Sequence, residues 1–70
     1  MLISEIPLYS TVKVIVKTKY FGNFVEGIIQ RQDGLYVVIC PHAVTTFHPK
    51  IVQEIKYDEM GRIHHIYLKI

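Results

Sequence analysis

Five side chains in this sequence are of types that bind metal ions: Cys40, His42, His48, His64 and His65. A zinc site needs four nitrogen or sulfur ligands, which usually come in pairs from short loops. Cys40 and His42 lie two positions apart where a strand is expected to end, but no Cys-x-x-Cys or His-x-x-x-His pair is present. His64 and His65 are adjacent on an expected strand, so they point to opposite faces and cannot share an ion. We therefore expect no metal site and no cofactor.

Cys40 and His42 are also the one pair that could act as a nucleophile and its base. Nucleophilic catalysis needs in addition a third group that orients the base, and an oxyanion hole. The sequence indicates neither, and Asp33 and Asp58 are placed to form turns. We expect a protein that is not an enzyme.

Cations mixed with aromatic residues could instead bind a single-stranded nucleic acid. Small β-barrels stack bases on aromatic rings beside a basic groove. The residues that would do so here are Lys17, Lys19, Tyr20, Arg31 and Tyr36. A formal net charge of +2 permits this function but does not require it, and lysines on an outward strand face also serve solubility.

Apolar residues are abundant for so small a domain. They make up 50% of 70 residues, and a domain of this size has little interior in which to bury them. Part of the apolar surface is therefore expected to contact another protein. The candidate partner-binding residues are Tyr20, Phe21, Phe24, Ile63, Tyr67 and Ile70. The function expected first is a protein-binding module or small regulator that forms a homodimer, and the alternative is nucleic-acid binding.

Short strands must position these residues. Alternating valines in residues 11–18 predict a half-buried strand, and further strands are expected at about 24–30, 35–40 and 44–47. Asp33-Gly34 predicts a type I′ turn, which places Arg31 opposite Tyr36. Helix is limited to one turn near residues 49–51.

The last twenty residues predict a second hairpin around a turn from Asp58 to Gly61. The expected pairs are Tyr57 with Ile63, Ile55 with His65, Gln53 with Tyr67, and Val52 with Leu68. This register leaves apolar residues on both faces of the hairpin, so we expect the homodimer to form through residues 51–70.

Val12 to Ile39 resembles the opening of SH3-like barrels. Alternating valines lead to a loop with Tyr20-Phe21-Gly22, a second strand containing Gly27-Ile28-Ile29, and the Asp33-Gly34 turn into an apolar strand. Tudor-like, KOW-type and small photosynthetic accessory barrels share this outline. The resemblance implies an all-β fold, a small barrel or strongly bent antiparallel sheet of five to six strands, that binds rather than catalyses. The basic loop motif of KOW-type RNA binding is missing.

Residues 1–70 are expected to form one domain, with an extended lead-in at 1–10 and a β-barrel at 11–70. One cysteine suits a reducing compartment, and no run approaches the ~20 apolar residues that span a bilayer. We therefore expect a cytoplasmic protein without membrane contact.

Overall fold

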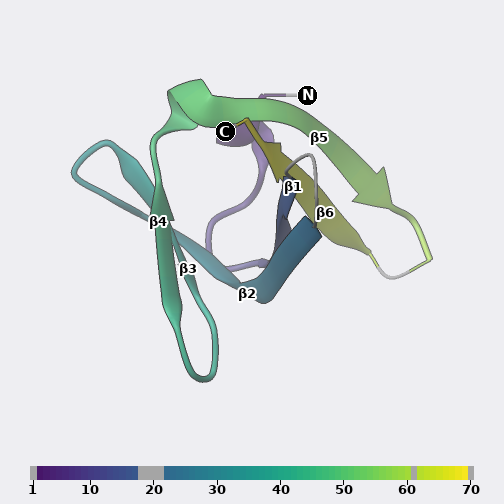
Figure 1. The fold of residues 1–70 in the computed structure, drawn as a ribbon, viewed down its shortest axis with the longest axis horizontal. Helices are drawn as coiled ribbons and strands as arrows, with labels where there is room; N and C mark the ends of the chain where they lie inside the picture. Colours follow the sequence, from purple (N-terminus) through teal and green to yellow (C-terminus); the bar gives the residue numbers. More distant parts are fainter. Residues whose placement is uncertain (1, 18–21, 61, 70) are drawn as a thin grey trace.

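The computed structural model describes residues 2–17, 22–60 and 62–69, the side chains of Lys17 and Asn23 excepted. These residues form an all-β fold with two short 3₁₀ turns (Figure 1). In chain order the elements are η1 (Ile3–Glu5), β1 (Thr11–Lys17), β2 (Gly22–Gln32), β3 (Leu35–Ile39), β4 (Val44–Phe47), η2 (Pro49–Ile51), β5 (Val52–Asp58) and β6 (Ile63–Leu68).

The six strands make one sheet in the order β4-β3-β2-β1-β6-β5. Neighbouring strands are antiparallel except β1 and β6, which run parallel. The all-β prediction is confirmed. The prediction of a wholly antiparallel sheet is wrong, because β1 and β6, from the two ends of the described chain, pair in the same direction. The sheet curls, so that η2 connects its two edge strands, but it is not closed into a barrel within the described residues. A relation to SH3-like barrels stays a prediction.

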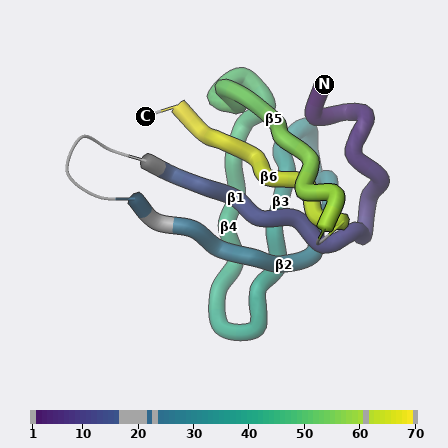
Figure 2. Tube along the Cα trace, turned by 90° about the vertical axis from the view of Figure 1, so that its right-hand side faces the viewer, coloured from purple at the N-terminus to yellow at the C-terminus, as the bar shows by residue number. Residues whose placement is uncertain are grey.

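The curl comes from a bend in β2. Its first part pairs with β1 and its second part with β3, and Ile28 pairs with both neighbours. The bend lies at Gly27, where an added Cβ would collide with the carbonyl oxygen of Ile39 and lie 3.0 Å from Cys40 Sγ. Only glycine allows the strands to cross this closely. Figure 2 shows the result, with β3 and β4 running across the direction of β1 and β2.

The core lies on the concave face of the sheet. Its fully buried side chains come from β1, β2, β3 and β6, namely Val12, Val14, Ile29, Val38 and Ile66. The segment before β1 is not simply an extended lead-in, because it contains η1 and inserts Ile6, which is 3% exposed, into the core. Main-chain bonds from Tyr9 N to Ile29 O (2.7 Å) and from Ile29 N to Ser10 O (3.0 Å) attach this segment to β2.

The predicted register of the first hairpin is confirmed. Arg31 pairs with Tyr36 and Ile29 with Val38. The turn residues Asp33 and Gly34 have φ angles of 53° and 80°, as a type I′ turn requires at both central positions. Local chemistry therefore determines this hairpin.

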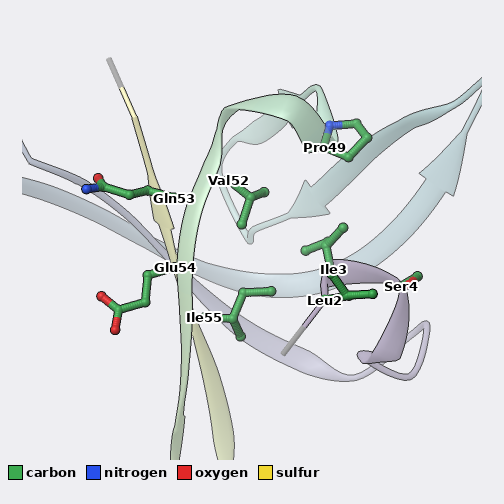
Figure 3. Close-up of a pocket in the computed structure, with 8 residues that line it drawn as sticks. All are labelled: Leu2, Ile3, Ser4, Pro49, Val52, Gln53, Glu54 and Ile55. Atoms are coloured by element: carbon green, nitrogen blue, oxygen red, sulfur yellow. The ribbon is translucent and has the colours of Figure 1, made fainter.

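The predicted register of the second hairpin is wrong by one residue over most of its length. Ile55 pairs with Ile66 and Tyr57 with His64, and a bulge between Val52 and Glu54 restores the expected pairing of Val52 with Leu68. Figure 3 shows the effect of the bulge, with Gln53 and Glu54 on one side of β5 and with Val52 and Ile55 on the other.

The shift moves the apolar residues of β5 to the core side of the hairpin. A slip of one residue moves every side chain to the opposite face, so Ile55 lies with Ile66 on that side. The outer side of the hairpin carries Glu54, Lys56 and Asp58 beside Ile63, His65 and Tyr67. The expectation that both faces are apolar is therefore wrong.

Candidate functional site

The residues proposed for metal or thiol chemistry lie apart. No group of three or more His, Cys, Asp or Glu side chains that could hold a metal ion is found in the described part of the chain. Cys40 is a free, half-buried thiol, and its Sγ lies 4.0 Å from the carbonyl oxygen of Val38. His48 has a structural contact, because its Nδ1 accepts a hydrogen bond from Lys50 N (3.0 Å) and caps η2.

The two adjacent histidines of β6 have different neighbours. The His64 ring lies 4.7 Å from the Tyr57 ring on the core side of the hairpin. His65 Nε2 lies 3.9 Å from Asp58 Oδ2 on the outer side. The prediction that these two side chains point to opposite faces is confirmed.

The structure describes only part of the proposed nucleic-acid site. Lys19, Tyr20 and the side chain of Lys17 lie outside the described residues. Arg31 is exposed, and its Cζ lies 5.8 Å from the centroid of the Tyr36 ring, so the predicted cation–π pair is present. Tyr36 itself is only 4% exposed and stacks on Phe47 at 5.9 Å. The prediction that its ring is a platform for bases is wrong, because the ring is part of the core.

Three of the proposed partner-binding residues, Phe24, Ile63 and Tyr67, share the convex, outer face of the sheet. Ile15 in β1 pairs with Phe24 in β2 and with Tyr67 in β6. The side chains of Phe24, Ile15 and Tyr67 therefore form one row across three strands, here called the Phe24–Tyr67 row. Ile63 lies on the same face, four positions before Tyr67 on β6. Tyr20, Phe21 and Ile70 lie outside the described residues.

Phe24 is the most exposed member of this row, at 61%. Lys13 Nζ lies 4.1 Å from the centroid of its ring, and Lys56 Nζ lies 5.5 Å from the centroid of the Tyr67 ring. A lysine held over an aromatic face contributes about 0.5–1 kcal/mol at an exposed site. Both rings therefore have a lysine over one face on the outer side of the sheet.

The charges beside this row are mixed in sign. The basic residues Lys13 and Lys56 alternate with the acidic residues Glu26, Glu54 and Asp58 in the strand pairing. A surface that binds phosphates usually gathers one sign of charge on one face. The described part of the outer face lacks that excess.

A second apolar row crosses the outer face beyond the bend in β2. Ile28, Ile39 and Val44 are paired in sequence across β2, β3 and β4, and all three are exposed. Residues from β1 to the end of β3 line a shallow hollow beside it. Another hollow, of about 350 Å³, lies between the amino-terminal segment and β5 (Figure 3), where Ile3 faces Val52 and Ile55.

Sequence reasoning does not identify the positions of Ile15 and Lys56 beside these rings, and it considers Lys13 only as one of several cations near aromatic residues. Ile15 interrupts two lysines on the polar side of an alternating strand, and this interruption is the signal that could have identified it. The contacts of the two lysines depend on which strands are neighbours, and the sequence does not show this.

Compared with known proteins, the chain matches no family model, no curated protein and no solved structure. In the described residues no helix has the length and hydropathy to cross a membrane.

Proposed function

We propose that this protein is a non-enzymatic binding module, or small regulator, that recognises another protein through the outer face of β2, β1 and β6. The observation that carries the proposal is the Phe24–Tyr67 row, in which an exposed aromatic ring and Tyr67 flank Ile15 on one face of three paired strands. Aromatic side chains on rigid elements are typical anchors of protein interfaces.

The mixed charges favour a protein over a nucleic acid as the partner. Lys13 and Glu26 are direct cross-strand partners, and Glu54 pairs with Tyr67 at the end of the row. Charges of both signs around an apolar row resemble the polar rim and apolar centre of a protein–protein interface. Such a surface would repel phosphates at some positions and attract them at others.

The test is an affinity purification with the wild-type chain, Phe24→Ser and Met60→Ser as baits, followed by reconstitution with each purified candidate. Met60 is a matched control because it is apolar and 99% exposed but lies in the β5–β6 turn. We expect a partner whose dissociation constant rises ~30-fold or more with Phe24→Ser, as for an interface hot spot, and less than about twofold with Met60→Ser.

Two results would contradict the proposal. One is that every candidate partner binds Phe24→Ser as tightly as the wild type. The other is that no protein binds, while the wild type binds single-stranded oligonucleotides at low salt and releases them steeply as salt is added, as counterion release demands. The second result would favour the nucleic-acid alternative.

We also propose that the protein acts in the cytoplasm without a cofactor. Cys40 is a free thiol in the structure, and an unpaired cysteine is more easily kept reduced in that compartment.

A further inference from the structure

The two edges of the sheet differ in how well they are protected against pairing with another strand. β5 carries Glu54, Lys56 and a bulge, all of which discourage the addition of a strand. β4 reads Val44-Thr45-Thr46-Phe47, with no charge, no proline and no bulge. Among the described residues its second side pairs with no strand.

The main chain of β4 directs two residues toward this open side. Cys40 N donates to Ala43 O at 2.8 Å, and hydrogen-bonded pairs alternate along an antiparallel ladder. Thr45 and Phe47 therefore bond to β3, whereas Val44 and Thr46 turn their N–H and C=O groups away from it. Val44 is also 63% exposed.

We propose that β4 pairs with β4 of a second copy of this chain about a two-fold axis, which makes one continuous sheet. In an antiparallel pairing centred on Thr45, Val44 of each copy lies opposite Thr46 of the other. These are the residues whose main-chain groups point toward the side of β4 that no strand of the described residues occupies, so two pairs exchange about four hydrogen bonds.

The sequence of β4 suits a second copy because the pairing is self-complementary. A residue on a two-fold axis meets itself, so a charge there would repel its own copy. Thr45 lies on the axis, and a Thr–Thr pair across two strands is favourable. On the same face Val44, the last residue of the row of Ile28 and Ile39, lies against Thr46 of the other copy, which is followed in the strand pairing by Val37 of that copy. The interface is separate from the Phe24–Tyr67 row, so the dimer and the proposed function can fail independently.

The first test is sedimentation velocity from about 10 µM to 1 mM with the wild type, Thr46→Pro and Gln53→Lys. Thr46→Pro removes an N–H that faces the open side and leaves the bonds to β3 in place, which an edge strand tolerates. We expect a wild-type dimer that Thr46→Pro weakens ~10-fold or more, since one donor is lost from each copy. Gln53→Lys, on the edge of β5, should dimerise as the wild type does. Thr46→Lys replaces the proline variant if circular dichroism shows that the latter is unfolded.

The second test measures the register. Thr45→Cys in a Cys40→Ser background should form a disulfide-linked dimer under mild oxidation, because facing residues of a non-hydrogen-bonded pair lie within disulfide distance. Gln53→Cys in the same background is the control and should not. A wild-type monomer at 1 mM, a Thr46→Pro variant that dimerises like the wild type, or equal cross-linking at both positions would overturn the proposal.

Discussion

Gly27→Ala tests whether the bend in β2 organises the fold. An added Cβ would meet the carbonyl oxygen of Ile39, which is main chain and cannot rotate away, and would lie 3.0 Å from Cys40 Sγ. Forcing extra volume into a packed site costs about 1–3 kcal/mol. We expect the upper part of this range, because β2 and β3 must separate for the methyl group to fit.

Gly34→Ala is the matched control, because it adds the same methyl group without a steric contact. A Cβ at Gly34 would have nothing within 4 Å, and the loss comes from its φ of +80° alone. An alanine in this left-handed region costs about 1–2 kcal/mol. Gly27→Ala therefore tests the need for space between β2 and β3, whereas Gly34→Ala tests the need for a positive φ in the turn.

The free energy of unfolding would be measured by urea denaturation, and the melting temperature by circular dichroism. A single core of this size provides about 3–5 kcal/mol, and each kcal/mol shifts the melting temperature by roughly 4–8 °C. Gly27→Ala should thus lower it by roughly 10–20 °C, and Gly34→Ala by roughly 4–15 °C. If Gly27→Ala proves as stable as the wild type, or more stable than Gly34→Ala, then close crossing at Gly27 does not maintain the bend.

Three further predictions concern the core and the outer face. Ile66→Ala should lower the free energy of unfolding by about 2–5 kcal/mol and Ile66→Val by about 0.5–1.5 kcal/mol, because the side chain is fully buried; equal losses in urea denaturation would refute this. Ile6→Ala should lower the free energy of unfolding by about 2 kcal/mol or more, although Ile6 precedes the first strand, whereas Leu8→Ala, at an exposed position, should change it by no more than about 0.5 kcal/mol. An Ile6→Ala variant as stable as the wild type would show that the amino-terminal segment does not seal the core. Phe24→Ala should cost no more than about 1 kcal/mol, the value of its contact with Lys13; a larger loss in thermal melts would make Phe24 a structural residue instead of a binding one.

The part of the fold that could be predicted from the sequence is the part determined by neighbouring residues. Asp33-Gly34 specifies the β2–β3 register, since few residue pairs accept positive φ at both central positions of the turn. The predicted β5–β6 register is wrong because of the bulge after Val52, which turns both Val52 and Ile55 toward the core. No local sequence pattern predicts such a bulge.

The candidate site could be predicted only as single residues. Phe24, Ile63 and Tyr67 are recognisable in the sequence as apolar or aromatic residues, and the structure places them on one face. Phe24 and Tyr67 lie near each other because both pair with Ile15, and Tyr67 is far from Ile15 in the sequence. The burial of Tyr36 could not be predicted from the sequence. Its strand has apolar residues on both faces, and alternation alone does not show which of the two faces is covered.

The parallel pairing of β1 with β6 affects how the chain reaches its native state. Val12 pairs with His64 and Val16 with Leu68, so the centre of the sheet joins segments from opposite ends of the described chain. The β2–β3 hairpin can form alone within microseconds, but contacts between such distant segments slow folding to milliseconds or longer. During synthesis, the valines of β1 therefore lack their β6 neighbours until Ile66 and Leu68 have been made, and apolar strand surface that is exposed in this way favours aggregation.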